Sequence, residues 1–374
     1  MQLLTPGFTF QFKCIADKCT YSCCKGWSIL FEEDERDNFL QFGINDIDSL
    51  SIRLGPHRYK MRNDSNGNCP YLEDSGLCHM ITSCGSDAVL CYTCKSFPRF
   101  TNPKNQYIEY TLSNACPAVI DILSATPCPI TFEVIDCENS IEYKIHFPDN
   151  LIVCRDTMID LMQIHDFPVW LRLYIIYTFA RKIKNQAESD TYSIIEQYNS
   201  VDYLIEMCNE LLSIDINLPT KLQLMVNYLN IVHVKNSTDI HERYYAQLFS
   251  EALEIDIDYL SESFIQFENI YSQYSSLMEN IVVNDIFRKT NCNSSEDLYY
   301  STIMMIIMMS LIKFSLFLEY LNSDKEDIYN LNYNIIVYFA RKFEHISFIH
   351  IKNQAIEFEK KEWLAPGNIF TLLR

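Results

Sequence analysis

Hydrophobic residues recur at three- and four-residue spacing through the C-terminal part of the chain, beginning near Leu151. This period is typical of amphipathic α-helices that bury one face. Pro168 and Pro219 separate some of the periodic segments, because proline does not continue a helix. The pattern predicts helices near residues 151–163, 168–186, 190–213, 219–235, 241–254, 257–280, 295–322 and 333–360. We therefore expect an α-helical bundle in this region.

The N-terminal part of the chain has shorter and more varied patterns. Residues 105–112 alternate between apolar and polar side chains as a strand does, and residues 130–135 with 141–147 predict a β-hairpin. A helix is expected in the run from Phe31 to Gly43, since glycine favours a helix end. Another is expected from Pro117, a residue that suits the first turn of a helix.

These elements predict a mainly α protein in three regions. A cysteine-rich α+β region, the metal-binding head, is expected over residues 1–128. A β-hairpin bridge is expected over residues 129–150, followed by the helical bundle over residues 151–374.

One predicted helix contains a long apolar run, STIMMIIMMSLIKFSLFL, at residues 301–318. Its uncharged part is shorter than the roughly 20 residues that cross a bilayer, and Lys313 interrupts it. We therefore expect a buried core helix, and leave peripheral membrane association open.

Cysteines concentrate in two windows near the N-terminus, residues 12–27 and 68–100. These windows hold nine of the fifteen cysteines in the chain. The spacings are C-x4-C-x3-C-C and C-x8-C-x5-C-x6-C-x2-C. In the final C-x2-C pair, the backbone can curl so that both sulfurs face one metal. The windows therefore predict a thiolate site.

Disulfides and metal ligation both bring cysteines together, and the rest of the chain favours metal. A chain of 374 residues buries a large core without covalent cross-links. The odd number of cysteines does not suit complete pairing, and the N-terminal sequence MQLLTPGFTFQFK lacks the pattern of a secretory signal. We therefore predict a reduced, cytoplasmic protein with a metal or iron-sulfur site.

Charge and glycine content exclude other classes of function. The chain has a formal net charge of -19, and residues 129–374 carry 35 of the acidic side chains and 19 of the basic ones. An acidic surface repels phosphate backbones, so nucleic-acid binding is not expected. No glycine occurs between residues 86 and 366. The glycine-rich turn of a Rossmann-type nucleotide site and the P-loop are therefore both absent.

The cysteine windows resemble a known family. The segments FKCIADKCTYSCCKGW, CPYLEDSGLC, LCYTCKSFPRF and SNACP, with FARKFEHISFI near the C-terminus, are similar to the flagellin lysine-N-methylase (FliB) family. That family is related to a cysteine-rich CxxCxxCC group described as zinc- or iron-chelating. The resemblance covers nearly the whole chain and is specific in the cysteine windows.

The resemblance implies an S-adenosylmethionine-dependent methyltransferase that acts on lysine side chains of flagellin and carries a 4Fe-4S cluster. The radical-enzyme spacing C-x3-C-x2-C is absent, so any use of a cluster with S-adenosylmethionine would be non-standard. Cys84 and Cys91 are additional to the family-type cysteines. The cysteines carried over as metal ligands are Cys14, Cys19, Cys23, Cys24, Cys69, Cys78, Cys94 and Cys116.

Eight thiols exceed what one four-cysteine site uses, so several arrangements stay open. One is a cluster plus a zinc ion, and another is one cluster with the surplus cysteines structural. Adjacent Cys23 and Cys24 point to different sides in most backbone conformations, which favours their division between sites. The catalytic base, the S-adenosylmethionine site and the oligomeric state are not predicted.

Two other functions remain as alternatives. The first is a zinc- or iron-binding structural module that binds a protein partner without catalysis. The second is a redox sensor with reactive thiolates. Arg341, Glu344 and His345 share one face of a predicted helix, and a solvated or core-satisfied cluster is favoured there over a catalytic trio.

Overall fold

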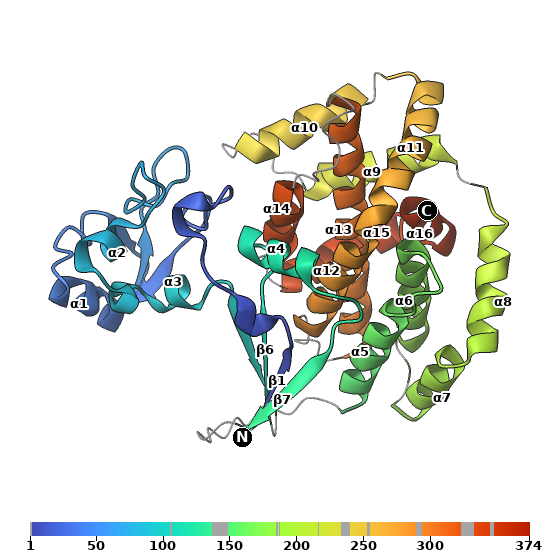
Figure 1. Cartoon of the computed structure of the whole chain (residues 1–374), viewed down its shortest axis with the longest axis horizontal. Coiled ribbons are helices and arrows are strands. Elements are labelled where there is room, and N and C mark those ends of the chain that lie inside the picture. The colour runs from blue at the N-terminus through green and yellow to red at the C-terminus, as the bar shows by residue number, and fades with distance from the viewer. Residues whose placement is uncertain are drawn as a thin grey trace.

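The fold is mainly α, as predicted, with two small sheets in the N-terminal part. Figure 1 shows a large helical body and a smaller head that projects from one side of it. The computed structural model describes residues 2–104, 107–136, 149–184, 186, 188–215, 217–232, 240–252, 255–288, 294–322, 333–344 and 348–374.

The body is built from the predicted helical segments, with some differences in where helices end. Its helices are α5 (Asp149–Met162), α6 (Val169–Ile183), α7 (Glu188–Tyr198), α8 (Val201–Leu212), α9 (Leu218–Val232), α10 (Ile240–Ala252), α11 (Ile257–Tyr271), α12 (Ser275–Arg288), α13 (Ser295–Asn322), α14 (Tyr333–Glu344), α15 (Phe348–Lys360) and α16 (Pro366–Leu373).

Three of the predicted segments, 190–213, 257–280 and 333–360, each contain residues of two helices, and two helices were not predicted in full. The segment predicted at 190–213 is split because the Ser200 side chain caps a new helix, α8, by accepting a hydrogen bond from the backbone N–H of Tyr203. The segment predicted at 257–280 is interrupted by a short 3-10 turn at Ser272–Tyr274. Most of α12 lies after the end of the segment predicted at 257–280, and all of α16 lies after the end of the segment predicted at 333–360.

Helix α13 is the central element of the body. It is 28 residues long and apolar enough to cross a membrane, but its most apolar window is entirely buried within the protein. It packs against α6, α14 and α15. Lys313, the charge that interrupts it, forms an ion pair with Glu268 at 2.6 Å. The helix is therefore buried in the core, as its sequence predicts.

A four-stranded sheet flanks the body. Its strand order is β5 (Arg99–Pro103), β6 (Tyr107–Leu112), β1 (Gln2–Pro6) and β7 (Phe132–Asp136). Strand β1 is parallel to β6 and antiparallel to β7. The sequence predicted that residues 130–135 would pair with 141–147, but β7 pairs with β1; residues 141–147 and Cys137 lie outside the described part.

The sheet and the following helix belong to the hydrophobic core of the body. Phe8 and Leu112 lie in that core, and α4 (Pro117–Ala125) packs on α12 and α14. This core therefore includes residues from before position 128. The predicted division of the chain at residues 128 and 150 concerns independent folding and stays a prediction.

The head has a separate core. Its three-stranded antiparallel sheet has the order β2 (Leu30–Glu32), β4 (Arg58–Met61) and β3 (Ser51–Arg53), and its helices are α1 (Glu33–Gln41), α2 (His79–Cys84) and α3 (Tyr92–Ser96). Phe31 is buried against Phe39 and stacks on Tyr59 at 5.4 Å between ring centroids. The predicted helix beginning near Phe31 is α1, and Gly43 follows its end with a φ of +85°.

The two chain segments that connect the head to the body lie next to each other in space. Trp27 precedes the head strands and Phe97 follows α3, and their ring centroids are 4.8 Å apart. Figure 1 shows the head extending from this region beside α4 and α14. Both cysteine windows lie along this junction and inside the head.

Candidate metal centres

Three cysteines occupy the N-cap positions of helices. Cys78 precedes α2, Cys91 precedes α3 and Cys116 precedes α4. Backbone N–H groups two and three residues further along the chain lower the pKa of each thiol. Burial outweighs this effect at Cys78 and Cys116, whose pKa values are raised overall. The pKa of Cys91 is lowered, mainly by a hydrogen bond from Cys94.

Two further cysteines have similar donors in loops. The sulfurs of Cys19 and Cys69 each accept a hydrogen bond from the backbone N–H two residues further on. The backbone N–H of Cys69 also donates to the carbonyl oxygen of Cys24 at 2.8 Å. Gly26 N–H donates to the Gly67 carbonyl oxygen at 2.9 Å. These backbone hydrogen bonds join the two cysteine windows.

The cysteines divide into two groups according to which thiols interact electrostatically. Cys19 interacts with Cys14, and Cys116 interacts with both of them. Cys23 also interacts with Cys14. We call this set, Cys14, Cys19, Cys23 and Cys116, the first thiol group. It lies where the head meets the body core, to which Cys116 belongs.

The second thiol group lies in the head. Cys69 interacts with Cys24, Cys78 and Cys91, and Cys94 interacts with Cys24, Cys69 and Cys91. Cys91 is in the core of the head, and Cys69, Cys78 and Cys94 pack against that core. The second thiol group is therefore Cys24, Cys69, Cys78, Cys91 and Cys94. Cys24 also interacts with Cys19 and with Cys23 of the first group, so the two groups meet at Cys24.

Hydrogen bonds join two pairs of thiols in the cysteine windows. A hydrogen bond from Cys23 lowers the pKa of Cys24 to about 7, and the same contact raises the pKa of Cys23. A hydrogen bond from Cys94 likewise lowers the pKa of Cys91, while the pKa of Cys94 is raised. One thiol of each pair is thus stabilised as a thiolate, the form that binds metal.

Burial has the opposite effect on isolated thiols. It raises the pKa of Cys69 to about 11 and that of Cys116 to about 11, because a charged sulfur loses its hydration. A bound cation would offset this cost by replacing the proton on each sulfur.

Arg341 of α14, a helix of the body, lies beside the first thiol group. Its guanidinium donates hydrogen bonds to the backbone oxygens of Tyr21, Ser22 and Ala115, at 2.7, 3.2 and 3.3 Å. It also lies over the ring of Tyr21, 4.1 Å from its centroid. Its charge lowers the pKa values of Cys19, Cys23 and Cys24 relative to what burial alone would give.

The neighbouring acid of the predicted trio is also part of the core. Glu344 accepts a hydrogen bond from the Ser113 hydroxyl at 2.5 Å and lies 3.5 Å from Arg288. Its side chain is buried. Arg341 and Glu344 both make contacts within the fold, His345 lies outside the described residues, and the choice between a solvated or core-satisfied cluster and a catalytic trio stays a prediction.

The distances between sulfurs bear on which metal the thiol groups could hold. The four sulfurs around a tetrahedral zinc ion lie about 3.8 Å apart, given a Zn–S bond of about 2.3 Å. In the part of the chain that the structure describes, three ligand atoms lie within 4.8 Å of one another at Cys128, His165 and Glu279, and not in the thiol groups. A four-iron cluster is larger and holds its four thiolates further apart. Each group has at least four thiols, the number of ligands that such a cluster takes.

All eight cysteines carried over from the resemblance are in one of the two thiol groups. Cys91, treated as additional, lies in the second group; its C-x2-C spacing with Cys94 was the sequence signal for this. Cys84 is at the end of α2, and its sulfur donates to the Phe42 carbonyl oxygen at 3.6 Å. Which metal each cysteine binds stays a prediction.

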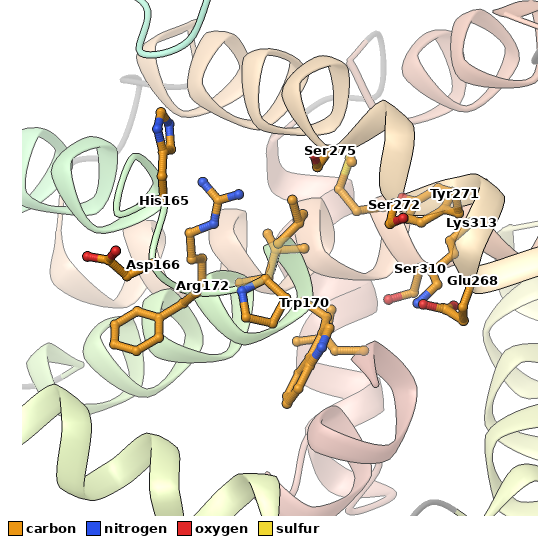
Figure 2. Close-up of a pocket in the computed structure, with 16 residues that line it drawn as sticks. His165, Asp166, Trp170, Arg172, Glu268, Tyr271, Ser272, Ser275, Ser310 and Lys313 are labelled. Carbon is orange, nitrogen blue, oxygen red and sulfur yellow. The ribbon is translucent and has the colours of Figure 1, made fainter. Parts of the chain in front are cut away.

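A cavity of about 300 Å³ lies in the body, away from the thiol groups. Figure 2 shows His165 and Arg172 toward one end and Glu268, Tyr271 and Lys313 toward the other. These residues come from the α5–α6 loop and from α6, α11 and α13. No sequence pattern indicated this cavity, because its residues follow no short motif.

Comparison with known proteins places these features in a family. Residues 155–372 match the family described as FliB lysine N-methylase C-terminal domain. The chain is 32% identical over 122 residues to the lysine-N-methylase of Salmonella typhimurium, an alignment that covers 30% of each chain. It is equally similar to the flagellar biosynthetic protein FliU of Salmonella muenchen, of which 72% is covered. No solved structure matches the chain.

The family match extends over more than half of the chain and covers most of the helical body. The alignment spans less than a third of the length of the Salmonella typhimurium relative. The body and the cysteine windows thus agree on one assignment, and this chain belongs to the FliB lysine N-methylase family.

Proposed function

We propose that the chain is an S-adenosylmethionine-dependent protein lysine N-methyltransferase that acts on flagellin in the cytoplasm. The observation that carries the proposal is the family match over residues 155–372. The relatives support it through their names, lysine-N-methylase and flagellar biosynthetic protein.

We further propose that the thiol groups hold a 4Fe-4S cluster. In the first thiol group, Cys19 and Cys116 have backbone N–H donors on their sulfurs, and Arg341 supplies a positive charge. In the second, the donors lie on Cys69, Cys78 and Cys91. When bound, such a cluster supplies a redox-active or structural iron centre whose potential depends on hydrogen bonds to its sulfurs. The group without the cluster would hold a zinc ion or remain structural.

Methyl transfer to lysine places two requirements on the protein. The substrate ammonium must lose its proton to a base, because only the amine lone pair can form the new N–C bond as the C–S bond of the sulfonium breaks. The leaving thioether is then neutral. The acidic surface of the body, with its excess of Asp and Glu, attracts lysine-bearing segments of a protein substrate.

Binding of the methyl donor is the first experiment for this proposal. Isothermal titration of the anaerobically purified, iron-loaded chain with S-adenosylmethionine, with and without flagellin, should show saturable binding. A chain that contains its full amount of iron but binds no S-adenosylmethionine would overturn the methyltransferase proposal and favour the metal-binding interaction module. Reversible thiol oxidation without stoichiometric metal would favour the redox sensor.

A further inference from the structure

Three metal-binding side chains meet in the body, outside the thiol groups. Cys128 lies in the segment after α4, His165 in the loop between α5 and α6, and Glu279 in α12. Their ligand atoms all lie within 4.8 Å of one another. Nε2 of His165 is 3.0 Å from Oε1 of Glu279. Segments distant in the sequence therefore bring a thiol, an imidazole and a carboxylate together.

The carboxylate of Glu279 is fixed from its other side. Its Oε2 accepts a hydrogen bond from Arg172 at 2.5 Å, and the same nitrogen of Arg172 donates to the Met162 carbonyl oxygen at 2.5 Å. Both side chains are buried. A buried carboxylate held in this way keeps its free oxygen directed toward His165, which is how outer partners orient metal ligands.

Cys128 is held in place by the helix that carries Glu279. Its sulfur donates to the backbone oxygen of Ser276 at 3.5 Å and lies 3.2 Å from Oδ1 of Asn280. The amide nitrogen of Asn280 in turn donates to the backbone oxygens of Leu123 and Thr126, at 2.9 and 2.8 Å. The segment that carries Cys128 is thus anchored to α12 on both sides of the sulfur.

We propose that Cys128, His165 and Glu279 form a binding site for a zinc-class divalent ion. Thiolate, imidazole and carboxylate are the three ligand types that zinc takes in proteins, and three protein ligands leave a fourth position for water or a small ligand. With the thiolate and carboxylate ionised and Arg172 positive, the site without metal carries a charge of about -1, which an added divalent ion reverses.

The site lies next to a cavity that a ligand can occupy, because one of its three residues, His165, lines that cavity. His165 and Arg172 both line the cavity of about 300 Å³, and Figure 2 shows them on the same side of it. A site with an open position beside a cavity has the arrangement of a catalytic rather than a structural zinc ion. The site uses no cysteine of either thiol group. Metal bound at this site can therefore be counted separately from metal bound by the thiol groups.

Cobalt(II) is the probe, because a cobalt–thiolate bond gives an absorption signal that zinc lacks. The full chain, purified anaerobically and first loaded with iron and sulfide, is titrated with cobalt(II). We expect one further equivalent of bound metal with a thiolate-to-cobalt band, and displacement of that band by zinc. The absence of a further equivalent in the unmodified chain would overturn the proposal.

Variants test whether these residues are the ligands of the additional cobalt ion. His165→Ala removes a half-exposed side chain and should fold normally, and Cys128→Ser keeps the size of the side chain. Both should weaken cobalt binding at least tenfold while leaving iron content unchanged. The matched controls are His57→Gln, an exposed histidine of the head, and Cys208→Ser, a buried cysteine of α8, and both should bind cobalt normally. Unchanged cobalt affinity in His165→Ala and Cys128→Ser would contradict the site.

Discussion

Arg341 donates a hydrogen bond to the backbone oxygen of Tyr21 at 2.7 Å, although the two residues are 320 positions apart in the chain. The guanidinium also lies over the Tyr21 ring at 4.1 Å from its centroid. The helix that bears Arg341 belongs to the body, and Tyr21 lies between two cysteines of the first window. The body of the protein therefore positions the cysteine loop directly.

Replacing Arg341 with lysine should destabilise the protein although the charge is kept. A lysine ammonium cannot reach the carbonyl oxygens of Tyr21, Ser22 and Ala115 in one plane as a guanidinium does. We expect the free energy of unfolding to fall by roughly 2–4 kcal/mol in urea denaturation, since several buried acceptors lose a charged donor. Lys360→Gln, which removes an exposed i,i+3 ion pair, is the control and should change it by less than about 0.5 kcal/mol. Equal stability of the Arg341→Lys variant and the unmodified chain would show that this contact is not structural.

Cys91 should be as necessary for metal retention as Cys94. It occupies the N-cap position of α3, and a hydrogen bond from Cys94 lowers the pKa of its thiol, which favours the thiolate that binds metal. Elemental analysis of anaerobically purified Cys91→Ser and Cys94→Ser should show the same loss of iron or zinc per chain. Cys84→Ser is the control, because Cys84 lies outside both thiol groups, and it should keep full metal content. A full metal content in Cys91→Ser would show that Cys91 is not needed to retain the metal.

The sequence was most informative where the signal is local. Cysteine spacing predicted a thiol-rich site, while the division of Cys23 and Cys24 between two metal sites stays a prediction. Helical periodicity predicted most of the body, and Lys313 in the apolar run correctly indicated a core helix. These features depend on neighbouring residues, whose geometry is set by the backbone.

The remaining features depend on contacts between distant segments. Periodicity identifies a strand but not its partners, so the pairing of β7 with β1 was not predicted, and the predicted partner at residues 141–147 lies outside the described part of the chain. The contact of Arg341 with Tyr21 and the meeting of Cys128 with His165 have no spacing motif that a single sequence could reveal. They arise from the tertiary packing of helices against the sheet.

The head should be dispensable for folding of the body. Trp27 and Phe97 are 4.8 Å apart between ring centroids, so a short glycine-serine linker can replace residues 28–96. We expect this variant to retain cooperative thermal unfolding. A fragment of residues 151–374 should lose it, because it lacks α4 and β1 from the body core. Cooperative unfolding of the 151–374 fragment would instead support the boundary predicted from the sequence.

Lys221 should make stability depend on pH. Burial lowers its pKa well below the usual value, and the nearby charge of Lys313 acts in the same direction. Within the described residues its Nζ has no hydrogen-bond partner. The unfolded chain therefore binds one more proton than the folded chain between the lowered pKa and about 10.4, so stability rises with pH through that range.

Lys221→Met should remove that rise and stabilise the protein at neutral pH by about 1–2 kcal/mol, because an apolar side chain replaces a buried amine. Urea denaturation at several pH values between 7 and 10 measures both effects. Lys360→Met, at an exposed position, should keep the pH slope of the unmodified chain. An unchanged slope in Lys221→Met would show that this amine does not titrate as its burial indicates.

Methyl transfer to flagellin is the most direct test of the central claim. Flagellin is incubated anaerobically with S-adenosylmethionine and the iron-loaded chain, and its lysines are then examined by mass spectrometry. We expect methylated lysines with the unmodified chain and with Cys208→Ser, and none with Cys19→Ser or Cys69→Ser. Flagellin that stays unmodified with a chain that retains its full iron content would contradict the assignment of this protein as a flagellin lysine methyltransferase.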